Sequence, residues 1–185
     1  QMGSLTVFPI SLNMANRLAG LLTMEQALAK RVLVVEELEP ASVNQARFIN
    51  KSARDMVFLM AGEVITGGKQ NRTLATDALL GPDSATVLPL YCVEKGRWEG
   101  KKDFAPAATV APQAVREMAA QRAEQKEIWS EVAKANARMG SVTAGEDLAA
   151  AMGKEETVRR LADLRKPVVG KLPDSTAGIV VARRG

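Results

Sequence analysis

Strand-like segments fill the first half of the sequence and helix-like segments fill the second half, and this segregation limits the fold more than any other feature. From residue 112 onward, apolar residues recur at helical spacing. Strands followed by helices favour an α+β fold over alternating βαβ units. We therefore expect a single domain over 1–185, with an antiparallel or mixed sheet from the N-terminal half packed with helices from the C-terminal half. Apolar or β-branched runs that are typical of strands lie at 5–10, 32–38, 43–50, 56–65 and 85–93.

Some element boundaries can also be predicted from single residues. Thr23 and Gln26 have the spacing of a capping box, which predicts the start of a short helix. A long helix is expected over 112–139, because Pro112 suits the first turn of a helix and Gly140 suits the position just after its end.

Near the end of the chain, a second helical region is expected over about 144–165, with a break at Gly153 and Pro167 after its end. A last strand is expected at 179–182. Since the chain stops soon after this strand, we also expect the native protein to continue beyond Gly185.

The sequence contains no histidine and one cysteine, and these counts exclude several classes of chemistry. Without histidine, the chain cannot build Ser-His-Asp or Cys-His catalysis or an imidazole metal site. Cys92 lies in a strand-like run, which favours a small buried side chain over a nucleophile. We expect no zinc or transition-metal site; oxygen ligands for Mg²⁺ or Ca²⁺ stay possible, and no cofactor is indicated.

The net charge of +4 is spread along the chain rather than concentrated. Residues 1–111 carry twelve Lys/Arg and eleven Asp/Glu, and residues 112–166 carry ten and nine. Nucleic-acid proteins usually carry a basic face, so we expect no specific nucleic-acid partner. No apolar run approaches the ~18 residues of a membrane helix. Together with the lone cysteine, this predicts a cytoplasmic protein without a membrane partner.

The densest polar region consists of two separate segments. The loop Gly67–Thr73 combines paired glycines, which free backbone amides, with cationic and amide side chains, so it has the chemical parts of an anion site. Its spacing matches neither the Walker A loop nor Gly-x-Gly-x-x-Gly. Gly-Gly beside polar residues is also a common solvated turn. The second segment holds Glu94, Arg97 and Trp98.

We expect the two polar segments to meet in space. A strand near 56–65 leads into the first segment and a strand near 85–93 leads into the second, so both would leave the sheet at one end. Lys69, Arg72 and Arg97 would then gather, with Glu63 and Glu94 as the nearest carboxylates. One positive charge would be left over, which predicts an anionic ligand.

The stretches Ala61–Glu63, Gly67–Thr73 and Cys92–Trp98 resemble the ADP-ribosylglycohydrolase- and rhodanese-phosphatase-associated protein domain family. The name of that family implies a place in NAD or ADP-ribose metabolism but no particular reaction. The resemblance favours a role for the polar segments over a chance turn. Polar residues are costly near a core unless they form a connected network or bind something.

Two functions are consistent with these residues. In the first, the domain handles a phosphorylated or ADP-ribose/NAD-related metabolite, an anionic small molecule, and Glu63 or Glu94 acts as the general base if there is chemistry. In the second, the chain is a non-catalytic structural or oligomerisation module, such as a homo-oligomer built on the helix of 112–139, and the polar cluster is a buried scaffold. The ligand-binding residues of the first hypothesis are Gly67, Gly68, Lys69, Gln70, Asn71, Arg72, Thr73, Arg97 and Trp98.

Overall fold

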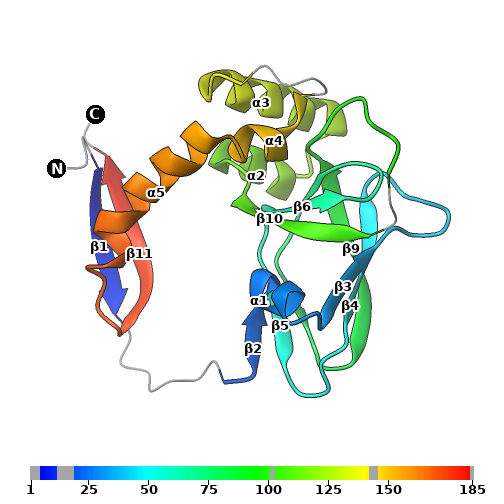
Figure 1. Cartoon of the computed structure of the whole chain (residues 1–185), viewed down its shortest axis with the longest axis horizontal. Coiled ribbons are helices and arrows are strands. Elements are labelled where there is room, and N and C mark those ends of the chain that lie inside the picture. The colour runs from blue at the N-terminus through cyan, green and yellow to red at the C-terminus, as the bar shows by residue number, and fades with distance from the viewer. Residues whose placement is uncertain (1–4, 12–18, 101–102, 142–145, 184–185) are drawn as a thin grey trace. The chain divides into compact units, whose positions relative to one another are not determined.

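The expected α+β fold is confirmed, with mostly antiparallel strands followed by helices (Figure 1). The structure is a computed structural model that describes residues 5–11, 19–100, 103–141 and 146–183. The chain divides into two units. Unit 1 joins Gln1–Ala19 to Lys154–Gly185, and unit 2 comprises Gly20–Gly153.

The main sheet of unit 2 has six strands, and each neighbouring pair is antiparallel. The two edge strands meet at a bridge between Glu36 and Asp103, so the sheet is curled enough for its edges to touch. In spatial order the strands are β10 (Phe104–Val110), β6 (Glu63–Gly67), β7 (Arg72–Leu74), β9 (Ser84–Cys92), β4 (Gln45–Asn50) and β3 (Leu33–Glu36).

A smaller sheet combines β2 (Leu21–Thr23), β5 (Met56–Leu59) and β8 (Ala78–Leu80), with β2 parallel to β5 and β8 antiparallel to it. The helix α1 (Met24–Ala29) follows β2 directly. Its predicted capping box is confirmed, because the Gln26 amide donates to Thr23 Oγ1 at 3.3 Å and the Thr23 amide donates to Gln26 Oε1 at 3.0 Å.

The strand expected over 56–65 is two strands in different sheets, β5 and β6, because the chain turns between them. β10 was not predicted at all; Pro106 and three alanines give it little of the β-branched composition that marks a strand.

Three further helices cover the face of the main sheet that lies opposite α1. They are α2 (Gln113–Ala120), α3 (Gln125–Arg138) and α4 (Leu148–Met152). The single helix predicted over 112–139 is wrong: Arg122 has a φ of 58°, which ends α2, and the Glu124 amide donates to Glu127 Oε2 at 2.8 Å as α3 begins. The predicted stop at Gly140 is confirmed, since its φ is 65°.

Two apolar cores lie on opposite faces of the main sheet. One is packed between the strands and α1, and the other is packed against α2, α3 and α4. Adjacent residues of β6 supply both, because Ile65 belongs to the first core, Val64 belongs to the second, and both are fully buried. Val64 and Ile65 of β6 and all three residues of β7 are therefore buried, and this centre of the sheet positions the loops at the strand ends.

Unit 1 consists of the antiparallel pair β1 (Leu5–Ser11) and β11 (Thr176–Arg183) with α5 (Glu155–Val169). The predicted last strand and the helix break at Gly153 are confirmed, although residues 144 and 145 of the predicted helical region lie outside the described residues. Pro167 lies inside α5 rather than after it, so the helix continues at the cost of one backbone hydrogen bond. Among the described residues, no helix has the length and apolarity needed to cross a bilayer.

Candidate functional site

The two polar segments lie side by side, as predicted. β7 pairs antiparallel with both β6 and β9, so β6 and β9 run in the same direction and the chain leaves both at the same end. The Val93 amide donates to the Asn71 carbonyl at 2.9 Å, and Gln70 Nε2 donates to the Glu94 carbonyl at 3.0 Å.

The paired glycines bring the β6–β7 loop against its neighbours. Gly67 and Gly68 have φ values of 109° and 52°, which favour glycine. A Cβ atom on Gly67 would lie 2.6 Å from the Asp103 carbonyl oxygen, and one on Gly68 would collide with the Phe104 ring. The glycines are therefore needed for close packing of the chain on itself.

The backbone amides of this loop are also bound within the protein. The Gly67 amide donates to Asn71 Oδ1 at 3.0 Å, the Gly68 amide to the Asp103 carbonyl at 3.0 Å, and the Lys69 amide to Glu37 Oε1 at 2.9 Å. The backbone amides that we expected to bind an anion thus donate to acceptors within the protein.

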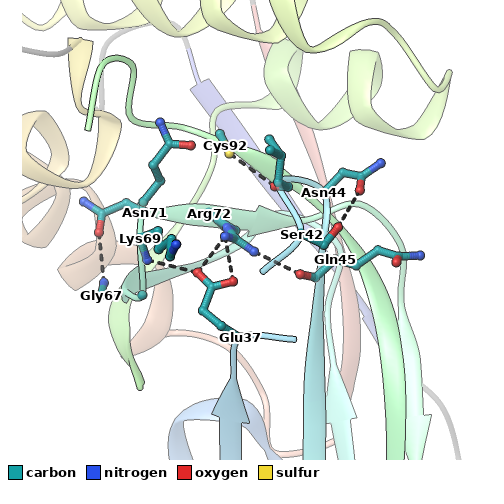
Figure 2. A network of polar contacts seen from close by, with 12 residues as sticks. Glu37, Ser42, Asn44, Gln45, Gly67, Lys69, Asn71, Arg72 and Cys92 are labelled. Carbon is teal, nitrogen blue, oxygen red and sulfur yellow. Dashed lines mark hydrogen bonds and ion pairs between the residues drawn. The ribbon is translucent and has the colours of Figure 1, made fainter. Parts of the chain in front are cut away.

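Arg72 is fully buried, and its guanidinium is held from several sides (Figure 2). Nη2 donates to both oxygens of Glu37, at 2.6 and 2.9 Å, and Nη1 donates to the Gln45 carbonyl at 3.0 Å. The guanidinium carbon lies 5.4 Å from the centroid of the Phe104 ring. Nε is enclosed without a hydrogen-bond partner among the described residues. The charge is therefore neutralised by Glu37, which the sequence prediction did not include.

Cys92 lies beside this ion pair and is fully buried, as predicted. Its Sγ donates to the Val43 carbonyl at 3.3 Å (Figure 2). Burial raises the pKa of the thiol to about 11, and the nearby Arg72 charge offsets only part of this effect. The group is a neutral thiol at pH 7 and is not an activated nucleophile.

Glu94 and Arg97 form a second ion pair, and this one is bidentate. Arg97 Nε and Nη2 donate to the two Glu94 oxygens at 2.6 and 2.7 Å, and Arg97 Nη1 donates to the carbonyls of Gly68 and Glu99. Burial raises the pKa of Glu94, but the hydrogen bonds from Arg97 and from the Asn71 amide, with the charge of Arg97, lower it below the ordinary value. Each guanidinium nitrogen of Arg97 thus has an acceptor within the protein.

Asn71 connects this pair to the helices. Its Nδ2 donates to both Asp147 oxygens at 3.1 Å, and Asp147 caps α4 by accepting from the Ala149 amide at 2.9 Å. Thr73 is also buried, and its hydroxyl donates to the Glu63 carbonyl at 3.2 Å. We use the name polar cluster for Glu37, Gly67–Thr73, Glu94, Arg97 and Asp147.

Lys69 and Trp98 lie at the rim of the polar cluster. The Lys69 ammonium is 5.2 Å from the centroid of the Trp98 ring, a cation–π distance. Trp98 is 41% exposed, and Lys69 is half-buried. Of the predicted ligand-binding side chains, Lys69, Arg97 and Trp98 contact solvent, and the others are buried.

Glu63 does not belong to the polar cluster. It begins β6, whereas the loop follows the other end of that strand, about 13 Å away at ~3.3 Å per residue. Glu63 Oε2 accepts from the Met60 amide at 2.8 Å. Burial raises the pKa of Glu63, opposed in part by this bond and reinforced by Glu25 and Asp77. Its pocket of about 120 Å³ is smaller than the ~300 Å³ at which ligand pockets usually begin.

The expected surplus of positive charge is therefore wrong. Two carboxylates that the prediction left out, Glu37 and Asp147, belong to the polar cluster together with Glu94. These three carboxylates carry as many negative charges as Arg72, Arg97 and Lys69 carry positive charges. Glu37 and Asp147 come from segments distant in sequence, and a spacing rule does not find such partners.

A groove lined in part by Glu37 is acidic. It has a volume of about 320 Å³, and four of its six lining residues are carboxylates. Within the described ranges, no group of three or more His, Cys, Asp or Glu side chains is arranged to hold a metal ion. The lining residues are Glu36, Glu37, Leu38, Glu39, Arg47 and Asp103.

Residues 1–185 match the family of the ARG and Rhodanese-Phosphatase-superfamily-associated Protein domain. The match covers the whole chain, and the chain therefore belongs to this family. The resemblance noted from the two polar segments is confirmed at this level. Neither a curated protein nor a solved structure matches the chain.

Proposed function

We propose that this member of the family is a non-catalytic assembly module, and that its polar cluster is a buried scaffold which fixes the loops of unit 2. One observation carries the proposal: the guanidinium groups of Arg72, through Nη2, and of Arg97, through Nε and Nη2, both bind carboxylates of the chain itself, with N–O distances of 2.6 to 2.9 Å. Arg97 therefore has no open fork for phosphate or carboxylate, and Arg72 is fully buried.

The scaffold connects parts of the chain that are far apart in sequence. Arg72 in β7 binds Glu37 after β3, and Arg97 after β9 binds the carbonyl groups of the β6–β7 loop. Asn71 ties that loop to the first turn of α4. Because these links hold strands, loops and a helix in one arrangement, the polar cluster has a structural role that requires no ligand.

An anionic ligand would meet two obstacles at the buried part of the polar cluster. It would have to displace Glu37 or Glu94, and each displaced carboxylate would lose several hydrogen bonds to buried groups. The acidic groove beside Glu37 would also repel it.

Two further observations support an assembly role. Unit 1 exposes many large apolar side chains, which mark contact surfaces in proteins. The family description names a domain associated with other proteins, which fits a role beside partners rather than on a metabolite.

A second candidate function has one feature in its favour. Lys69 and Trp98 present a cation and a partly exposed ring at the rim, the chemistry that would hold an anionic nucleotide-like molecule. If ARG in the family description denotes an ADP-ribosylglycohydrolase, the molecule would be related to ADP-ribose or NAD.

Stability measurements with and without ligand separate the two functions. We expect ADP-ribose, NAD and inorganic phosphate to leave the unfolding midpoint unchanged, and Arg97→Ala to lower it without ligand. A bound ligand at ~100 times its Kd would add about 2.7 kcal/mol. Stabilisation of the wild type that is lost in Lys69→Ala and kept in Lys95→Ala, a nearby exposed lysine, would overturn the proposal in favour of the second function.

A further inference from the structure

The end of β9 and the two residues that follow it bind four separate segments of unit 2. We use the name β9 clamp for these residues, Tyr91–Glu94. Tyr91 is half-buried and the other three are buried. The four segments are the β6–β7 loop, the connection between α2 and α3, the start of α3 and the start of α4.

The first residue of α3 binds the β9 clamp as a neighbouring strand would. β4 begins at Gln45, which lies opposite Pro89, so β4 does not extend as far as Cys92. There the Gln125 side chain donates to the Cys92 carbonyl and accepts from the Cys92 amide, both at 2.9 Å. A residue of a paired antiparallel strand makes the same two hydrogen bonds. Because Cys92 is fully buried, both groups need this partner.

The next residue of the β9 clamp turns its amide towards the polar cluster. The Val93 amide donates to the Asn71 carbonyl at 2.9 Å, and the Asn71 amide donates to Glu94 Oε2 at 2.9 Å. Glu94 also accepts two hydrogen bonds from Arg97. The polar cluster is thus bound to the same four residues that bind the first turn of α3.

Two more contacts join the β9 clamp to the helices. The Tyr91 hydroxyl donates to the Ala123 carbonyl at 2.9 Å, shortly before α3 begins. The Leu148 amide donates to the Val93 carbonyl at 2.9 Å as α4 begins, and Leu148 is fully buried. The starts of α3 and α4 therefore depend on one segment, and the polar cluster depends on the same segment.

We propose that the β9 clamp couples the polar cluster to α3 and α4, so that all three open and close as one cooperative unit within unit 2. Proteins open locally in contiguous cooperative units of this kind. A segment whose main chain is bound on both sides cannot move towards one side without breaking its hydrogen bonds to the other. The inference goes beyond the proposed function, because a scaffold could fix the loops without coupling them to the helices.

The coupling would let unit 2 transmit a contact from one site to another. A partner that moved the first turn of α3 would loosen Glu94 and Arg97 through the β9 clamp. Arg97 Nη1 donates to the Gly68 carbonyl at 3.0 Å, beside Lys69 at the rim of the polar cluster. Coupling between two binding sites is reciprocal in free energy, so a molecule bound at the rim would affect the helices to the same extent.

Hydrogen exchange at single residues, measured by NMR, tests the coupling. Gln125→Ala removes both hydrogen bonds to Cys92 and leaves two buried groups without this partner, so the exchange rate of the Cys92 amide should rise about tenfold or more. We expect the same factor at the Asn71 and Leu148 amides, although they are bonded elsewhere. A common factor is the signature of a common opening.

The matched control is Gln113→Ala. Gln113 also begins a helix, α2, but its side chain donates to Glu117 of that helix, so the three exchange rates should stay unchanged. A rise confined to the Cys92 amide would overturn the proposal, because α3 would then fray on its own. An equal rise in the amides of β3 and β4 would also overturn it, because unit 2 would then open as a whole.

A variant at the other end of the β9 clamp tests reciprocity. Arg97→Ala should raise the exchange rates of the Cys92 and Leu148 amides, because Glu94 loses its ion pair. Lys95→Ala is the control, since Lys95 follows Glu94 but is exposed. Unchanged rates in Arg97→Ala would contradict the coupling. Ligand-induced stabilisation tests the proposed function separately, so either proposal can fail while the other holds.

Discussion

Unit 2 buries charged side chains, whereas unit 1 exposes apolar ones. Arg72 in unit 2 has no exposed surface, while Val180 in unit 1 is 52% exposed. Buried charge is stable in unit 2 because the chain supplies its counter-charges and hydrogen-bond partners. The apolar surface of unit 1 has no comparable partner within the described residues of the unit. The contrast teaches that unit 2 is determined by its own contacts, whereas the described residues of unit 1 form no buried core.

The largest expected effect is at the buried ion pair. Arg72→Met should lower the free energy of unfolding by about 3–5 kcal/mol, because Glu37 would be left buried without its counter-charge. Urea unfolding checks this. The double variant Arg72→Met/Glu37→Leu should be more stable than Arg72→Met alone, since no unpaired charge remains. A loss below about 1 kcal/mol for the single variant would mean that the pair does not support unit 2.

A smaller loss is expected at the turn that brings the loop against Phe104. Gly68→Ala should cost about 1–3 kcal/mol or more, because the new methyl group meets the Phe104 ring and the φ of 52° is unfavourable for alanine. Gly96→Ala is the control: its φ is 93° but it has open space around it, so it should show the backbone strain alone. Equal losses at the two glycines would argue against close packing of the loop.

The smallest effect concerns acid stability. The pKa of Glu94 is lowered in the folded state, so its contribution is present above the unfolded value of about 4.3 and is lost as pH falls through the folded pKa. Glu94→Gln should therefore flatten the loss of stability below pH ~4.3. Glu63 has the opposite sign, because its raised pKa makes its contribution disappear as pH rises through the folded value. Urea midpoints from pH 3 to 7 would contradict this assignment if both Gln variants changed the profile in one direction.

Much of the fold could be predicted from the sequence because local patterns determine it. The Thr23 cap, the β9 strand and the stop at Gly140 depend on neighbouring residues. β10 and the division between α2 and α3 depend instead on packing and on the left-handed backbone at Arg122, which composition does not indicate.

For the candidate site, the sequence predicted which segments meet but not which charges pair. Strand direction was sufficient to place the two loops together. The partner of Arg72 is Glu37, 35 residues away, and Asp147 is 76 residues from Asn71. Only the tertiary fold brings these partners together. The sequence prediction left out Glu37 and Asp147 and therefore counted one positive charge too many at the polar cluster.

Hydrogen exchange of the whole chain, measured by mass spectrometry at several protein concentrations, tests the difference between the two units most directly. We predict that the amides of β6, β7 and β9 are strongly protected at every concentration, because unit 2 is held by its own contacts. The amides of β1, β11 and α5 should exchange faster than those of unit 2, because the described residues of unit 1 form no buried core. Protection of unit 1 equal to that of unit 2 would contradict the account.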